Sequence, residues 1–124
     1  MSVPDDVEKI LSPNEKVMMY IKQKIYSPHI SIDSLVITNE RIILRHPHEM
    51  NLKKDYTDYN FRDIANVVLE KGIKRSTIKL TLRLGGEPLG LKDLPNFDAE
   101  KAYGIIRENI NTPANPNPSP SPTS

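Results

Sequence analysis

Cysteine is absent from this chain of 124 residues. Disulfide bonds and thiolate metal sites are therefore excluded, and the absence fits a reducing compartment. No apolar run approaches the length of about 18 residues that a membrane-spanning helix needs. The N-terminal residues lack the basic region and the long apolar region of a signal peptide. We therefore expect a cytoplasmic protein without a membrane span.

An excess of charge of one sign is also missing. Seventeen basic and sixteen acidic residues give a formal net charge of +1. The chain has no broad positive field that would attract a phosphate backbone, so we do not expect a dedicated nucleic-acid binder. Its length suits one domain with one hydrophobic core.

Catalytic signatures are equally scarce. The chain has no G-x-S-x-G motif, no H-E-x-x-H motif and no P-loop, so we expect no enzyme and no cofactor. One partial metal motif is present, in which His46, His48 and Glu49 lie close together. Imidazole and carboxylate groups suit zinc or copper. Three such groups in a proline-containing loop are an incomplete set, so we favour a solvated loop and expect no metal.

The clearest positive signal is a β-hairpin. Two β-branched runs, 35–37 and 42–44, flank the polar residues 38–41. Alternation of apolar and polar residues predicts further strands on both sides of this hairpin. A change of apolar parity at Asp33 and Ser34 predicts a bulge there. The seven predicted strands span 16–26, 30–38, 41–46, 55–60, 66–71, 76–84 and 88–92, and the first places Val17, Met19, Ile21 and Ile25 on one face.

Helices are predicted at both ends of the domain. A short amphipathic helix is expected at 3–11, and a longer one at 97–110, with Asn96 as its N-cap. Gly104 weakens the second helix, and we interpret it as allowing the backbone to lie close to a sheet. Five prolines and no charge in 112–124 predict a disordered tail or linker. The folded domain is therefore expected to be 1–111. The apolar stripe of the second helix consists of Ala99, Ala102, Tyr103, Ile106 and Ile110.

Seven antiparallel strands followed by one amphipathic helix indicate a mainly β, α+β fold. Such strands form two packed sheets or a partly open barrel, and the C-terminal helix covers the open end. The short seventh strand, 88–92, offers an edge to which a partner strand can pair.

Three segments, together with this order of elements, resemble the pleckstrin-homology (PH) domain in its bacterial, YokE-like form. They are L-S-P-N-E at 11–15, L-V-I-T-N-E-R-I-I-L at 35–44, and Y-N-F-R-D-I-A-N-V-V-L-E-K-G at 59–72, which is followed by I-K-L-T-L. The resemblance implies a β-sandwich with a helix across one end, no enzymatic activity and frequent self-association. Eukaryotic PH domains often bind phosphoinositides through basic residues of their first two strands. Lys22 and Lys24 are present here, but 30–38 contains no Lys or Arg, so we do not expect selective inositide binding.

Clusters of basic residues are the candidate contacts for an anionic ligand or an acidic partner. Solvated charged faces are the alternative interpretation, because Glu70, Asp55 and Asp58 offset the charge. The candidate residues are Lys22, Lys24, Lys53, Lys54, Lys71, Lys74 and Arg75.

Three aromatic residues, Tyr56, Tyr59 and Phe61, have two interpretations. They can form a platform on which bases stack, or they can belong to the core or to an interface. The acidic residues around them would repel phosphate, which favours the second interpretation.

These observations predict a non-enzymatic module that binds proteins, including itself. Two alternatives stay open. The first is peripheral binding to an anionic membrane surface through the basic loops, and the second is a small nucleic-acid-binding barrel.

Overall fold

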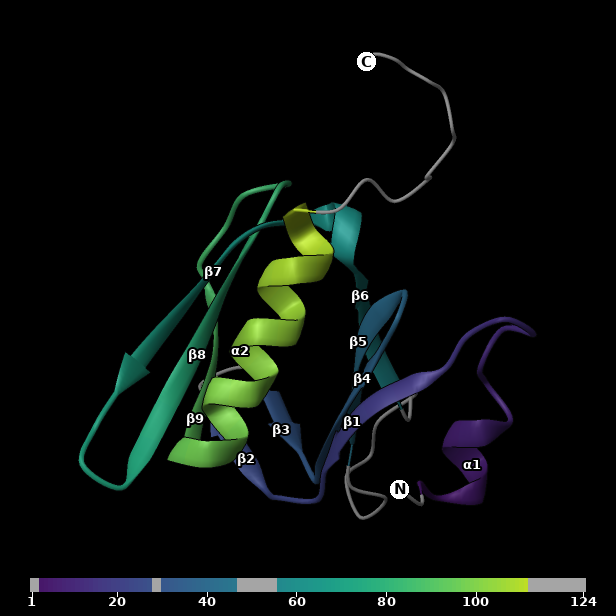
Figure 1. The fold of residues 1–124 in the computed structure, drawn as a ribbon, viewed down its shortest axis with the longest axis horizontal. Helices are drawn as coiled ribbons and strands as arrows, with labels where there is room; N and C mark the ends of the chain where they lie inside the picture. The colour runs from purple at the N-terminus through teal and green to yellow at the C-terminus, as the bar shows by residue number, and fades with distance from the viewer. Residues whose placement is uncertain (1–2, 28–29, 47–55, 112–124) are drawn as a thin grey trace.

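The computed structural model describes residues 3–27, 30–46 and 56–111 (Figure 1). The predicted tail, 112–124, and the residues His48, Glu49, Lys53 and Lys54 lie outside the described residues. The elements are α1 (Asp5–Glu8), β1 (Val17–Ile21), β2 (Ile25–Ser27), β3 (Ile30–Ile32), β4 (Ser34–Thr38), β5 (Arg41–Arg45), β6 (Tyr56–Asn60), the 3-10 turn η1 (Phe61–Asp63), β7 (Ile64–Lys71), β8 (Arg75–Leu82), β9 (Leu89–Pro95) and α2 (Asn96–Asn111).

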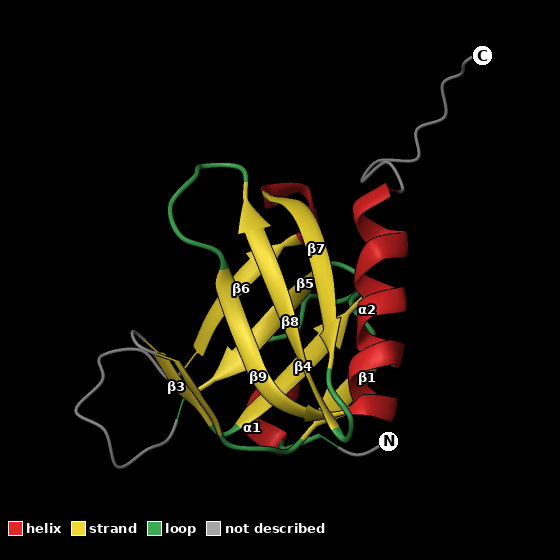
Figure 2. Ribbon diagram, turned by 90° about the vertical axis from the view of Figure 1, so that its left-hand side faces the viewer, coloured by secondary structure: helices red, strands yellow, loops and turns green. Residues whose placement is uncertain are grey.

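Within the described residues all strand pairs are antiparallel, and the strands form three sheets. One has the order β1-β4-β5-β6, the second has the order β7-β8-β9, and β2 and β3 form a small third sheet. Strands β7 to β9 cross in front of β4 to β6 in Figure 2, while α2 lies at the side of β7. The sheets do not close into a complete barrel. The predicted mainly β sandwich with a C-terminal helix is confirmed.

Two of the predicted strands are bent and divided. The first, 16–26, separates into β1 and β2, and the second, 30–38, separates into β3 and β4 at Asp33. The prediction of continuous strands was therefore wrong, although the second break lies at the predicted bulge. The Asp33 N–H still donates to the Arg45 carbonyl at 2.8 Å. At the first bend the chain passes from the large sheet (β1) to the small sheet (β2), and at the second it returns from the small sheet (β3) to the large sheet (β4).

The main core fills the space between the sheets and α2. Ala99, Ala102 and Ile106 are completely buried there, which confirms the predicted apolar stripe. Gly104 is exposed, and a Cβ atom built on it would meet nothing within 4 Å. The expected close approach of its backbone to a sheet was therefore wrong.

A second apolar cluster covers the outer face of the large sheet. Val3 and Val7 pack there on Val36 and Ile43, so α1 and the residue before Pro4 shield the middle strands. The helix itself has only four residues and is shorter than the predicted 3–11. Loss of register between Val17 and Met19 places Val17 in this outer cluster and Met19 in the main core. Their predicted common face was wrong, because a bulge reverses the alternation.

The β8–β9 hairpin differs from the prediction in both of its strands. Strand β8 ends at Leu82, and Leu84 is 99% exposed in the turn that follows. Gly85 and Gly86 have φ angles of 95° and 91°, which favour glycine. Strand β9 is seven residues long and therefore longer than the predicted 88–92.

Candidate functional site

The bend between β1 and β2 presents three polar residues, Lys22, Gln23 and Lys24. Ile21 and Ile25 on either side of the bend are buried in the main core. Because both ends are anchored, the polar residues between them are held at a defined place rather than on a loose loop. Lys22 and Lys24, two of the sequence-predicted candidates, are both exposed.

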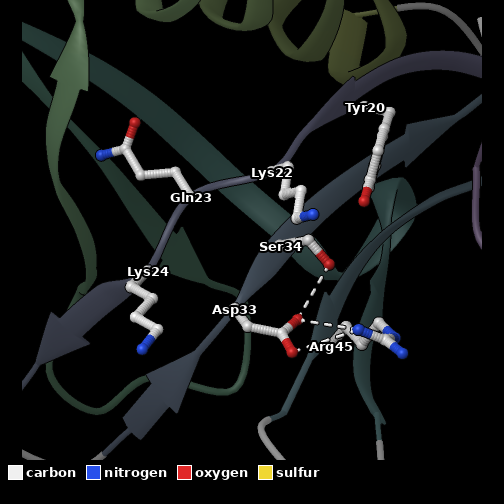
Figure 3. A pocket seen from close by; sticks show the side chains of 7 residues that line it. All are labelled: Tyr20, Lys22, Gln23, Lys24, Asp33, Ser34 and Arg45. Carbon is white, nitrogen blue, oxygen red and sulfur yellow. Dashed lines mark hydrogen bonds and ion pairs between the residues drawn. The ribbon is translucent and has the colours of Figure 1, made fainter.

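A cavity of about 320 Å³ opens at this bend (Figure 3). Residues from β1, from both strand bends and from the end of β5 surround it. Its lining consists of Tyr20, Lys22, Gln23, Lys24, Asp33, Ser34 and Arg45.

Arg45 and Asp33 form one wall of the cavity. Arg45 Nη1 lies 3.1 Å from Asp33 Oδ2, and its Nε lies 2.9 Å from Asp6 Oδ2. The hydrogen bond from Arg45 lowers the pKa of Asp6, and the same bond raises the pKa of Arg45 against the effect of burial. The buried Ser34 hydroxyl donates to Asp33 Oδ1 at 3.1 Å. The charge of Arg45 is therefore already balanced within the protein.

Lys22 and Lys24 form the other wall, and no carboxylate pairs with either of them in the described part of the chain. Two unpaired ammonium groups suit a carboxylate or a phosphate group. Within the described ranges, no three His, Cys, Asp or Glu side chains are grouped to hold a metal ion.

The second group of predicted cations lies in the turn between β7 and β8. A Cβ atom on Gly72 would come within 2.6 Å of the Arg75 carbonyl oxygen, so this tight turn requires glycine. The Asn96 amide donates to the carbonyls of Gly72 and Ile73, each at 3.1 Å. Its Oδ1 accepts from Ser76 Oγ at 2.5 Å. Asn96 was predicted to cap α2, but its side chain instead holds this turn against the start of the helix.

Asp93 connects the two groups of cations. Its carbonyl oxygen accepts a hydrogen bond from Gln23 Nε2 and another from Arg75 Nη1, the latter at 3.3 Å. Asp93 has a φ angle of 60° at an irregularity between β8 and β9, which turns its carbonyl away from the regular ladder. The β1–β2 bend, the β7–β8 turn and the start of α2 therefore share one end of the molecule, at the bottom of Figures 1 and 2. No local sequence pattern announces this bulge.

The predicted aromatic group is divided between two apolar clusters. Phe61 is buried in the main core and Tyr59 packs against it, whereas Tyr56 packs against the outer cluster. The Tyr56 hydroxyl donates to Asp6, and burial raises its pKa to about 12. This arrangement favours the core interpretation over a stacking platform.

His46 is buried, so the predicted solvated loop was wrong at this position. Its Nδ1 lies 3.1 Å from the Ser31 carbonyl oxygen, and its Nε2 lies 2.6 Å from Thr57 Oγ1. Both ring nitrogens therefore have protein partners, and His46 serves to connect neighbouring strands.

One buried ion pair was not anticipated from the sequence. The Glu15 side chain is completely inaccessible, and Arg41 Nε lies 2.8 Å from its Oε2. Thr38 Oγ1 donates to the same oxygen at 2.6 Å, and the Ser12 N–H donates to Oε1 at 2.9 Å. Burial acts to raise the pKa of Glu15, but these hydrogen bonds outweigh it and lower the pKa. The pair joins the segment before β1 to the start of β5.

No helix among the described residues is long and apolar enough to cross a membrane. No curated protein is recognisably similar to the chain. The chain matches the bacterial PH domain family over residues 11–108.

Three solved structures share the fold at low sequence identity. A DUF1696-family protein with a pleckstrin-homology domain from Shewanella loihica is 18% identical, with a TM-score of 0.66 over 86% of this chain and 88% of that one. A pleckstrin-homology domain from Shewanella amazonensis is 20% identical, with a TM-score of 0.61 over 86% and 83%. The N-terminal PH domain of Vps36 is 14% identical, with a TM-score of 0.61 over 82% and 83%.

Proposed function

Because the chain belongs to the bacterial PH domain family, we propose that it is a non-enzymatic, cytoplasmic module that binds proteins, including second copies of itself. The chemistry of the described site supports binding, since Lys22 and Lys24 line its cavity and neither is paired with a carboxylate among the described residues. The contact that we propose is strand pairing at β6.

Strand β6 is the observation that carries this proposal. It lies at the edge of the large sheet, and β5 is the strand that pairs with it in the described part of the chain. An unpaired edge presents N–H and C=O groups to which a partner strand can add. The edge predicted earlier, at 88–92, suits this role less well because β9 lies beside β2.

Charge does not protect the β6 edge. Asp58 is the acidic residue of this strand, and Arg41 Nη1 lies 2.7 Å from its carboxylate. The ion pair neutralises the side chain that would otherwise discourage pairing with a neighbour. A polar strand with balanced charge suits a reversible contact between folded proteins.

Light scattering over a range of protein concentrations tests the proposal. We expect the measured mass to rise above that of one chain, 14.1 kDa. Neighbouring residues of a strand direct their N–H groups to opposite sides. Of Thr57→Pro and Asp58→Pro, one therefore removes an outward N–H and should lower the mass while melting no lower than the alanine variant of the same position. Thr57→Ala and Asp58→Ala control for the lost side chains. A mass of one chain at every concentration would contradict self-association through β6.

A further inference from the structure

Helix α2 has one long face that is turned away from the strands. Figure 2 shows the helix at the side of the molecule, and its residues Ala99, Ala102 and Ile106 are buried in the main core. At about 100° per residue, the opposite face of the helix is centred on Gly104. We call this opposite face the outer face of α2. Its residues are all exposed, and they are Phe97, Glu100, Lys101, Gly104, Arg107, Glu108 and Asn111.

Gly104 lies at the middle of this face and near the middle of the helix, which spans Asn96–Asn111. A Cβ atom built on Gly104 would meet nothing within 4 Å, so no contact inside the described domain requires glycine here. Alanine would make the helix more stable. Glycine on a helix surface does, however, allow a second backbone to approach closely. The residue is therefore better explained by contact with an element of another molecule.

Four charged residues surround Gly104 at the spacing of neighbours on a helix surface. Glu100 and Lys101 precede it by four and three positions, and the other two, Arg107 and Glu108, follow it by three and four. Neither Glu100 nor Arg107 has an opposite charge three or four positions away in the helix. Glu100 pairs instead with Lys71 of β7, at 2.5 Å. No carboxylate pairs with Lys101 or Arg107 among the described residues.

A second copy of the helix, placed antiparallel across Gly104, meets this face with unlike charges. Helical spacing puts Glu100 and Arg107 on one side of the outer face. It puts Lys101 and Glu108 on the other side. Reversing the direction of the second helix keeps each side and exchanges the two ends. Glu100 of one copy then lies opposite Arg107 of the other copy. On the second side, Lys101 lies opposite Glu108.

We propose that the outer face of α2 is a contact between two copies of this chain, with the two helices antiparallel and crossing at Gly104. The charges select a second copy as the partner, because they sum to zero and attract their own reversed arrangement. A parallel pair would also bring unlike charges together, but it would align the two helix dipoles, whereas an antiparallel pair opposes them. Phe97, which is 74% exposed, would lie against the last turn of the partner's helix.

This contact shares with the proposed function only its partner, a second copy. It lies on α2, whereas the proposed strand pairing lies on β6 of the large sheet. One helix face buries less area than a stable dimer needs, so we expect a weak contact that depends on concentration. Two different two-fold contacts on one chain allow assemblies larger than a dimer.

Disulfide trapping of the full chain tests this contact even if it is weak. The chain has no cysteine, so Gly104→Cys supplies a single thiol. Antiparallel helices that cross at this position bring the two thiols of a pair within bonding distance. Leu84→Cys is the matched control, because Leu84 is 99% exposed in the turn after β8. Under mild oxidation we expect Gly104→Cys to form a disulfide dimer at least about tenfold faster than Leu84→Cys.

Charge reversal tests the direction of the pairing. In the chain with Gly104→Cys, Arg107→Glu places carboxylates opposite each other, so trapping should slow by about tenfold. Adding Glu100→Arg exchanges the two signs and restores the rate only if the helices are antiparallel. High salt should also slow trapping, because exposed charges hold the contact. All these positions are exposed, and the melting temperatures of the reduced variants will show that each one is folded.

Three results would overturn the proposal. They are equal trapping of Gly104→Cys and Leu84→Cys, no effect of Arg107→Glu, and failure of the added Glu100→Arg to restore the rate. The β6 variants Thr57→Pro and Asp58→Pro separate this contact from strand pairing, since neither should slow trapping. If trapping fails while a β6 proline still lowers the solution mass, the α2 contact is wrong and pairing at β6 stands. If trapping succeeds while neither proline changes the mass, the reverse holds.

Discussion

Glu15 shows how one residue organises the start of the domain. Its carboxylate is inaccessible, while the guanidinium of Arg41 is 18% exposed and also reaches the Ile10 carbonyl at 2.7 Å. A buried ion pair contributes mainly because removing one partner leaves the other charge without compensation. The pair therefore fixes the approach of the N-terminal segment to the large sheet.

We expect Glu15→Gln to lower the free energy of unfolding by about 3 kcal/mol, since it leaves Arg41 without its buried counter-ion. Chemical denaturation measures this change. Glu40→Gln is the control, because Glu40 is exposed beside Arg41 in the chain, and its effect should stay below about 0.5 kcal/mol. Equal effects of the two substitutions would contradict the role given to Glu15.

The same carboxylate makes stability depend on pH. The folded-state pKa of Glu15 is lowered, so its stabilisation is present above the ordinary pKa of a glutamate. It is lost as the pH falls through the lowered folded-state value. We expect the free energy of unfolding to fall more steeply below about pH 5 in the unmodified chain than in Glu15→Gln. Parallel pH profiles for the two proteins would refute this linkage.

Helix α2 contacts both larger sheets, β1-β4-β5-β6 and β7-β8-β9, through the main core. Ile106 is completely buried on its inner face, while Arg107 is exposed. Ile106→Ala should lower the free energy of unfolding by about 2–5 kcal/mol, through lost burial and the cavity left behind. Arg107→Ala should change it by less than about 0.5 kcal/mol. Similar denaturation midpoints for the two variants would show that the helix does not close the sandwich.

Two glycines of this region should respond in opposite directions to alanine. Gly104 lies in open space on α2, so Gly104→Ala should raise the free energy of unfolding by about 0.5–1 kcal/mol through higher helix propensity. Gly72→Ala should lower the melting temperature, because its Cβ would lie 2.6 Å from the Arg75 carbonyl oxygen. Thermal denaturation of both variants checks the pair of expectations, and a loss of stability in Gly104→Ala would contradict the first.

At the scale of the whole molecule, the folded domain is predicted to need nothing from 112–124. That segment contains no large apolar side chain and no charge. A chain ending at Asn111 should melt within a few degrees of the full chain, since the composition of the segment offers nothing to bury. A large fall in melting temperature would show that the segment docks on the domain.

Lipid selectivity also belongs to the whole molecule. We expect no preference for phosphoinositides over other anionic lipids, because the stretch 30–38 supplies no Lys or Arg beside Lys22 and Lys24. Vesicles of equal charge, with and without phosphoinositides, provide the comparison. A clear preference that is lost in Lys22→Ala with Lys24→Ala would contradict this expectation.

The sequence by itself determined the class of the fold and much of its core. Alternation along 76–82 and the stripe through Ala99, Ala102 and Ile106 identify buried faces, because burial follows the local period of a strand or a helix. The same reasoning failed at Val17, where a bulge reverses the alternation, and at Leu84, where the strand ends early.

Tertiary structure alone decided which distant residues meet. Glu15 and Arg41 are 26 positions apart, and Gln23 and Asp93 are 70 positions apart. Their contacts depend on sheet register and on bends, which are set by the packing of the whole core rather than by local periodicity. The turn between β7 and β8 meets the start of α2 in the same way, because the Asn96 amide donates to the Ile73 carbonyl across 23 positions of the chain.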